Sequence, residues 1–220
     1  MNSIVTRGNS MQNVDIDSSA RNANRINGSK KPVGWMVRAA FDGCPLIPVN
    51  GRQFVLNPLT EQIPATSPEL LRDAANWVAE VVDFSKATKI AGEEDKGAVL
   101  VAATALLVGL PFGLARWQSS GLQGQIKVPF ECEYTSGDLY LNGVESNDRV
   151  VIVDDVISTG GTMVSLIQAI RQCGAEIVDV VCVAEKSAYR GVERVQDETG
   201  IKIKTLLKLD LSGPTSAILD

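Results

Sequence analysis

The sequence predicts an α/β fold in which a mostly parallel, twisted sheet is flanked by helices. Between Thr88 and Lys208, strand-like runs of aliphatic residues alternate with apolar segments of helical length. Such alternation is typical of parallel strands joined by crossover helices. The chain has 220 residues, of which 45% are hydrophobic, enough to bury one good core. We therefore expect one main domain.

Residues 1–31 are rich in Asn and Ser and contain few large apolar side chains, so we expect a disordered tail there. Residues 32–220 are expected to form the single domain. The most apolar run, "GAVLVAATALLVGLPFG", reaches Pro111 after about fourteen residues, which is too short for a membrane-spanning helix. We interpret it as a buried helix and expect no membrane partner.

The first folded elements are predicted by turn and capping signals. In Pro45–Pro58, two short β-runs flank Asn50-Gly51, a dipeptide that favours the tight turn of a hairpin. Ser67-Pro68-Glu69 then offers an N-cap, a first-turn proline and an acidic first turn. Apolar residues follow at helical spacing, so we predict a helix to about Val82.

The remaining elements follow in β-α-β order. The runs "KVPFECEY" and "DLYLNG" predict a second hairpin around Ser136-Gly137. The predicted parallel strands are "TKIAGEE" (88–94), "PFGLARW" (111–117), Arg149–Asp154, Ile177–Ala184 and Ile201–Lys208, and the predicted helices between them are Gly97–Leu107 and Gly161–Cys173.

Composition excludes several kinds of chemistry. The chain contains no His, which removes imidazole as a general base, as a zinc ligand and as part of a Ser-His-Asp triad. Its four cysteines form no CxxC pair, so we interpret them as reduced structural thiols and expect a cytoplasmic location. A net charge of −5 argues against a broad nucleic-acid-binding surface, and we expect no nucleic-acid partner.

The segment "RVVIVDDVISTGGT", Arg149–Thr162, carries the strongest functional signal. In open α/β sheets, ligands bind beyond the carboxyl ends of the strands, so the polar residues after "VVIV" lie where a site is expected. The glycines and hydroxyls of Ser158–Thr162, at the start of a helix, suit a phosphate monoester. Asp154 and Asp155 cannot serve the same phosphate, because like charges repel. A ribose 5-phosphate fits both halves, with its hydroxyls on the aspartates and Mg²⁺ nearby.

At these residues the sequence resembles the type I phosphoribosyltransferases. Within that family it is most similar to the adenine enzymes and the archaeal purine salvage enzymes, over roughly Asn57 to Leu209. The resemblance implies a parallel five-strand core, a small hood from about residues 36–66 plus the C-terminal segment, and a flexible β-hairpin loop. It also implies transfer of the phosphoribosyl group of phosphoribosyl pyrophosphate (PRPP) to a purine, with release of pyrophosphate and with Mg²⁺ as cofactor.

The resemblance assigns roles residue by residue. Asp154 and Asp155 would hold the ribose hydroxyls and Mg²⁺ and, with Glu133, form the catalytic set. Glu185 and Tyr134 would contact the base. The full set implied to bind PRPP is Glu94, Asp95, Lys96, Gly97, Arg116, Asp154, Asp155, Ser158, Thr159, Gly160, Gly161 and Thr162.

Glu133 bears on the choice of base. In "FECEY" it matches the glutamate of the adenine enzymes, where the archaeal hypoxanthine/guanine enzymes carry Gly, so the resemblance favours adenine. The alternative is a glutamate exposed on one face of the hairpin, since polar residues normally alternate along such strands.

One segment departs from the family pattern. The family's mobile loop carries several Arg and Lys residues that meet the pyrophosphate, whereas "RWQSSGLQGQ" retains only Arg116 and has Trp117, Gln118 and Ser119 in place of the others. Three functions therefore stay open: a purine phosphoribosyltransferase, a related enzyme with an unusual acceptor, and a non-catalytic PRPP- or nucleotide-binding regulator. The family also implies a homodimer.

Overall fold

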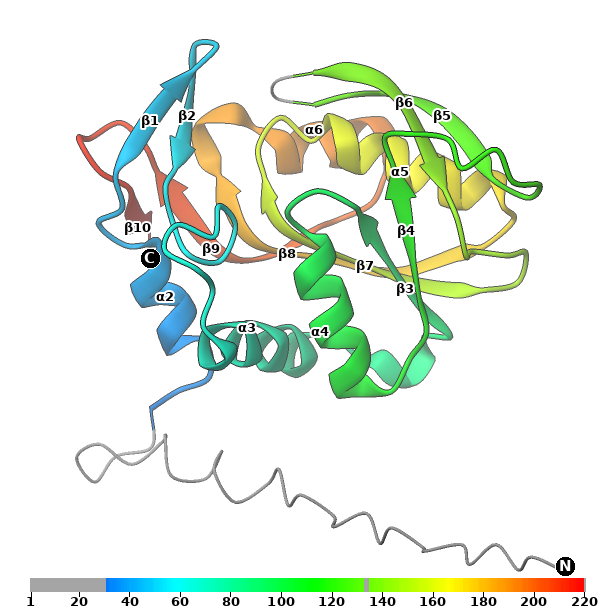
Figure 1. The fold of residues 1–220 in the computed structure, drawn as a ribbon, viewed down its shortest axis with the longest axis horizontal. Coiled ribbons are helices and arrows are strands. Elements are labelled where there is room, and N and C mark those ends of the chain that lie inside the picture. The colour runs from blue at the N-terminus through cyan, green and yellow to red at the C-terminus, as the bar shows by residue number, and fades with distance from the viewer. Residues whose placement is uncertain (1–30, 133–134, 220) are drawn as a thin grey trace, which may run out of the picture. The chain divides into compact units, whose positions relative to one another are not determined.

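The structure, a computed structural model of the chain, describes residues 31–132 and 135–219. Its main sheet has eight strands in the order β10-β9-β8-β7-β3-β4-β6-β5 (Figure 1). The five strands from β4 to β9 in this order run parallel, which confirms the predicted parallel core. The strands are β3 Lys89–Glu93, β4 Phe112–Arg116, β5 Ile126–Glu131, β6 Ser136–Leu141, β7 Arg149–Ile157, β8 Glu176–Lys186, β9 Lys204–Asp210 and β10 Ala217–Leu219.

Helices cover both faces of this sheet, because each face carries an aliphatic layer (Figure 1). Helices α2, α3 and α4 contribute Phe41, Val78 and Val101 to the core on one face. Helices α5 and α6 contribute Ile167 and Val195 to the core on the other. The helix bounds are α2 Trp35–Phe41, α3 Pro68–Val81, α4 Ala98–Val108, α5 Gly161–Gln172 and α6 Gly191–Thr199, with short 3₁₀ turns at Phe84–Lys86 and Ser187–Tyr189.

Local turn and capping signals in the sequence predicted the first hairpin and the start of α3 correctly. The hairpin of β1 (Leu46–Val49) and β2 (Arg52–Val55) turns at Asn50 and Gly51, which have φ of 51° and 77°. Ser67 caps α3, accepting a hydrogen bond from the Leu70 N–H at 3.1 Å. Both predictions are confirmed.

The hood consists of α2, the β1–β2 hairpin and the segment from Asn57 to Thr66, and the C-terminal segment packs against it. The hydroxyl of Ser216 donates to the carbonyl of Phe41 at 2.6 Å and accepts from the Cys44 N–H at 3.0 Å. An isolated bridge joins Pro45 to Thr215. The sequence therefore brings its last residues to the base of the first hairpin.

The structure corrects two predicted boundaries. Strand β7 continues past Asp154 to Ile157, because Val156 and Ile157 still pair with β8. The second hairpin is confirmed, but its turn is misplaced: Ser136 pairs with Glu131 inside the ladder, so the connection falls in residues 132–135. Helices α2 and α6 and strand β10 were not anticipated. In the described part of the chain, no helix is long and apolar enough to cross a membrane.

Candidate active site

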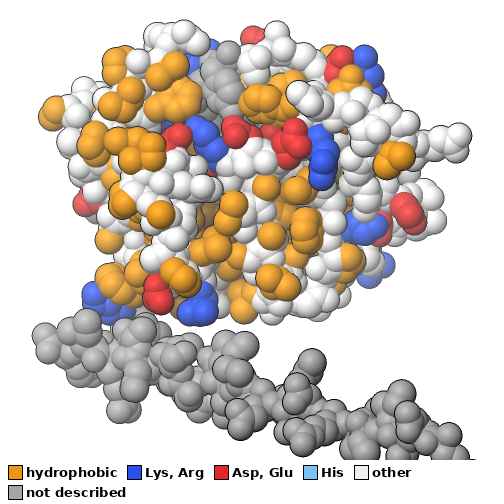
Figure 2. Space-filling view, viewed as in Figure 1, with side chains coloured by type: hydrophobic (Ala, Val, Ile, Leu, Met, Phe, Trp, Pro, Cys, Tyr) orange, Lys and Arg blue, Asp and Glu red, His pale blue; other side chains and the backbone are white. Residues whose placement is uncertain are grey.

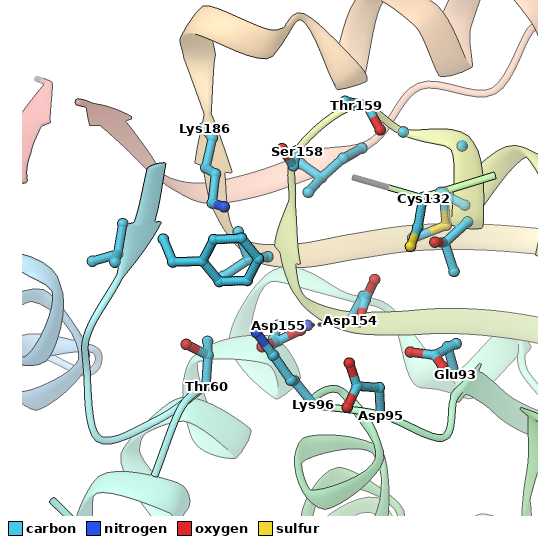
Figure 3. A pocket seen from close by; sticks show the side chains of 18 of the residues that line it. Thr60, Glu93, Asp95, Lys96, Cys132, Asp154, Asp155, Ser158, Thr159 and Lys186 are labelled. Carbon is cyan, nitrogen blue, oxygen red and sulfur yellow. Dashed lines mark hydrogen bonds between the residues drawn. The ribbon is translucent and has the colours of Figure 1, made fainter. Parts of the chain in front are cut away.

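A pocket opens where the carboxyl ends of β3 and β7 meet the hood, and it encloses a cavity of about 100 Å³ (Figure 3). The structure brings most of the predicted donor-binding residues together here. Those that line the pocket are Asp95, Lys96, Asp154, Asp155, Ser158, Thr159, Gly160, Gly161 and Thr162. Residues far apart in the sequence, including Phe54, Trp117, Cys132 and Lys186, complete its walls.

Asp154 and Asp155 lie side by side in the outer part of β7. On one side, β3 pairs with β7 only as far as Ile152, which leaves the two aspartates beside the pocket. The Asp155 N–H donates to Asp154 Oδ1 at 3.0 Å, while the buried Asp155 Oδ2 has no hydrogen-bond partner among residues 31–132 and 135–219. Burial raises the pKa of Asp155 to about 6. Burial, then the neighbouring Asp155 and Glu93 carboxylates, raise the pKa of Asp154 well above its ordinary value.

Glu93, at the end of β3, is a third buried carboxyl in this pocket. Only 7% of the residue is exposed, and its Oε1 atom has no hydrogen-bond partner among the described residues. Burial, followed by the charge of Asp95, raises its pKa to about 8. The described lining residues include five carboxyl groups and two ammonium groups, so acidic groups outnumber basic ones in the pocket. Figure 2 shows acidic side chains gathered in the middle of this face, with basic ones beside them.

The loop Ser158–Thr162 leads into α5 and depends on its two glycines for packing. A Cβ on Gly161 would lie 1.7 Å from the carbonyl oxygen of Glu131, and one on Gly160 would lie 2.6 Å from the carbonyl oxygen of Gly191. Gly160 also has a φ of 78°, which favours glycine. The loop presents the positive end of the twelve-residue helix to the pocket. Ser158 Oγ is buried and has no hydrogen-bond partner in the described part of the chain, as expected of a hydroxyl that contacts a ligand.

Lys96 and Lys186 bring positive charge to the wall of the pocket formed by Phe54. Lys96 Nζ lies 2.5 Å from Glu61 Oε1 and 4.7 Å from the ring centre of Phe54. Lys186 Nζ lies 4.7 Å from the same ring. Tyr189 links this wall to the hood, since its hydroxyl accepts from the Gln53 N–H at 2.8 Å.

Four of the predicted site residues that the structure describes do not line the pocket, namely Glu94, Gly97, Arg116 and Glu185. The Glu94 carboxylate instead accepts from the Trp117 N–H at 2.7 Å and lies 3.9 Å from Arg116 Nε. Gly97 packs against the site from behind, because a Cβ there would lie 2.4 Å from Asp154 Oδ1. The Glu185 carboxylate is buried and accepts from the Thr205 hydroxyl at 3.3 Å, so this placement does not support base contact. Glu133 and Tyr134 lie outside the described residues.

Sequence reasoning missed three charged residues of the pocket. Glu93 is adjacent to the predicted Glu94, and Lys186 is adjacent to the predicted Glu185. Glu61 lies in the loop before α3, to which the sequence assigned no function. The available signals were the acidic pair Glu93-Glu94 at the end of β3 and the pair Glu185-Lys186 at the end of β8.

The arrangement fits a polyanionic ligand that carries a divalent cation. Among the described residues, no group of three or more acidic or thiol side chains is arranged to hold a metal by itself. Asp154 and Asp155 provide two carboxylates, which suits Mg²⁺, since this ion commonly takes one or two carboxylates together with substrate phosphates. The unpaired Asp155 Oδ2 and the excess of acidic over basic groups both fit such an ion.

Comparison with known proteins identifies the family. A family model described as a phosphoribosyl transferase domain matches residues 62–211. The hypoxanthine/guanine phosphoribosyltransferase of Methanocaldococcus infernus is 45% identical over 168 residues, covering 76% of this chain and 91% of the relative. That of Methanotorris igneus is 40% identical over 184 residues, covering 84% of this chain and 100% of the relative.

Solved structures agree on the fold. The adenine phosphoribosyltransferase of Rhodothermus marinus has a TM-score of 0.66 and 27% identity, covering 79% of this chain and 97% of its own. That of Thermoanaerobacter pseudethanolicus has a TM-score of 0.67 and 22% identity, covering 79% of this chain and 98% of its own. The chain therefore belongs to the phosphoribosyltransferase family, whose members are pentosyl-transferring enzymes.

Proposed function

We propose that this chain transfers the phosphoribosyl group of PRPP to a purine base and releases pyrophosphate. One observation carries the proposal: Asp154 and Asp155 line the same pocket as the Ser158–Thr162 loop (Figure 3). Carboxylates suit ribose hydroxyls, and the loop at a helix N-terminus suits the 5-phosphate. The names of the relatives support a purine as acceptor.

The charges of the pocket suggest how the chain would promote this transfer. The Ser158–Thr162 loop would bind the 5-phosphate and fix the ribose, while Asp154 and Asp155 orient its hydroxyls. The carboxylates of the pocket that are ionised would stabilise the positive charge that develops on the ribose in an oxocarbenium-like transition state. Lys96 would attract the leaving pyrophosphate. When bound, Mg²⁺ neutralises part of the charge on the phosphates.

A 6-oxopurine is the base that two observations favour. Both relatives named above are hypoxanthine/guanine enzymes. Lys186 lines the pocket, and its ammonium group can only donate hydrogen bonds, which suits an oxo group better than an amino group. Adenine remains the second candidate, because Glu133, the residue that favours it, lies outside the described residues.

The test is a parallel assay of pyrophosphate release with hypoxanthine, guanine, xanthine and adenine. The Asp154→Asn/Asp155→Asn double variant serves as the blank. Lys186→Gln, which adds an acceptor to the pocket, should lower the ratio of kcat/KM for hypoxanthine to that for adenine about tenfold, a typical effect of one polar contact. An unchanged ratio would show that Lys186 does not select the base.

The same assay decides between this function and the alternatives. Trp117, one of the residues that replace the family's basic loop residues, lines the pocket, and its ring centre lies 5.6 Å from that of Phe130. Because of this replacement, an enzyme with an unusual acceptor and a non-catalytic regulator remain the alternative functions. Turnover with a purine would exclude the regulator, whereas PRPP binding without turnover on any of the four bases would favour one of the alternatives.

We also propose that the chain acts as a homodimer in the cytoplasm. The outward face of α4 supports the dimer, because Val99, Leu106 and Leu107 are exposed on a helix without charged residues. Phe112 at the start of β4 is also exposed. Figure 2 shows hydrophobic side chains gathered over α4. All four cysteines are free thiols, in agreement with a reducing compartment.

A further inference from the structure

The ion pair between Glu61 and Lys96 joins the hood to the loop before α4, inside the pocket. Lys96 Nζ and Glu61 Oε1 are 2.5 Å apart, and only 26% and 22% of the two side chains are exposed. Among the described residues that line the pocket, Lys96 and Lys186 are the two with cationic side chains. Glu61 therefore engages half of the positive charge that this part of the pocket offers to an anionic ligand.

The Glu61 side of the pair is held rigidly by the backbone. Asn57, which is fully buried, accepts hydrogen bonds from the N–H groups of Leu59 and Thr60 at 2.9 and 3.0 Å. Its amide nitrogen donates to the Thr60 hydroxyl at 2.6 Å. The Glu61 N–H donates to the Asn57 carbonyl at 3.2 Å. This buried turn fixes the point from which the Glu61 carboxylate reaches Lys96.

The Lys96 side is fixed at its backbone, whereas its ammonium group is carried on a flexible side chain. Gly97, the next residue, packs so closely against Asp154 that a side chain there would collide with the carboxylate. Beyond this anchor, lysine has a flexible four-carbon stem and three rotatable donors. In the structure, the stem brings the ammonium over the Phe54 ring and beside Glu61. Burial raises the pKa of Asp155, and the Lys96 charge partly opposes that rise, so Lys96 acts on the aspartate side of the pocket as well.

We propose that Glu61 is a positioning residue that holds Lys96 against the hood and competes with the pyrophosphate of the donor for its ammonium. The inference rests on the proposed function, in which Lys96 meets that pyrophosphate. When the donor binds, Lys96 exchanges a protein carboxylate for phosphate oxygens, and the contact between hood and loop is released. Glu61 thus lowers affinity for the donor and links its binding to the hood.

The experiment compares PRPP binding by wild type and Glu61→Gln, using isothermal titration calorimetry with Mg²⁺. The variant should bind PRPP about fivefold more tightly, the change that corresponds to the roughly 1 kcal/mol of a partly exposed ion pair. The KM for PRPP should fall by the same factor, while kcat changes less than twofold. Glu69→Gln removes the same charge from an exposed position on α3 and should leave binding unchanged. Thermal denaturation of each variant verifies its fold.

A double-mutant cycle separates competition from general repulsion. In a Lys96→Met background, Glu61→Gln should no longer change affinity, because its partner is gone. An equal gain in both backgrounds would mean that Glu61 merely repels anions, and unchanged or weaker binding in the single variant would equally overturn the proposal.

Inorganic pyrophosphate with Mg²⁺ provides a probe that does not depend on transfer. Tighter pyrophosphate binding by Glu61→Gln, in a protein that turns over no purine, would support the role of Glu61 and refute the proposed function. Normal wild-type turnover with no effect of Glu61→Gln on either ligand would do the reverse. If neither protein bound pyrophosphate or PRPP, both proposals would fail.

Discussion

Replacing Asn57 by alanine should destabilise the fold by about 3–4 kcal/mol, because one buried side chain makes four hydrogen bonds that contribute about 1 kcal/mol each. Asn57 has no exposed surface. Its amide nitrogen donates to the Val55 carbonyl and the Thr60 hydroxyl, and its oxygen accepts from the N–H groups of Leu59 and Thr60. Alanine would leave all four partners without that bond.

The assay is chemical and thermal denaturation of the variant beside wild type. For a domain of this size, the loss corresponds to a fall in Tm of roughly 6–16 °C. Thr60→Val is the matched control, because it removes only the 2.6 Å bond to the hydroxyl and keeps the backbone bonds. That variant should lose about 1 kcal/mol. A loss below about 1 kcal/mol for Asn57→Ala itself would refute the view that this residue holds the turn carrying Thr60 and Glu61.

Three further predictions follow from packing, charge and exposure. Gly161→Ala should reduce the rate of phosphoribosyl transfer by more than about a hundredfold at saturating Mg²⁺ and base, as measured by steady-state kinetics. The reason is steric, because the added Cβ would lie 1.7 Å from the Glu131 carbonyl oxygen and force the phosphate loop to shift. The pKa of Glu93 is raised from 4.5 to about 8 in the folded state, so its contribution to stability should be lost as pH rises through this window. The Tm of magnesium-free protein should accordingly fall between pH 5 and pH 8, and less so in Glu93→Gln. Leu106→Glu, on an α4 residue that is 87% exposed, should convert a dimer to a monomer in sedimentation, whereas Leu122→Glu, at 73% exposure, should not.

Much of the fold was predictable because its signals are local. Asn50-Gly51 specifies a hairpin turn through backbone conformation, and Ser67 specifies a helix start through one hydrogen bond. The turn at Ser136-Gly137 was misplaced, since a small polar pair can also occupy the first positions of a strand. The only large apolar residues of helix α6 are Val192 and Val195, too few to predict a helix from apolar spacing.

The site was predicted where several signals coincide and missed where one position decides. The loop Ser158–Thr162 and the two aspartates share one segment, which made them recognisable. The choice between Glu185 and Lys186 is different, because the end of β8 is buried on both faces and shows no alternation of polar and apolar residues. A shift of one residue exchanges the faces of a strand, so sequence alone does not determine which neighbour faces the pocket. Glu93 and Glu94 pose the same problem at β3.

The close fit of Gly161 against the Glu131 carbonyl makes the phosphate loop and the second hairpin one mechanical unit. Strand β5 ends at Glu131 and leads directly to Cys132 on the pocket wall. Because Glu131 packs against Gly161, a shift of this strand would move the phosphate loop directly, whether or not a ligand is bound. An insertion within β5 would move Glu131 away from Gly161, so such insertions should be rare among relatives.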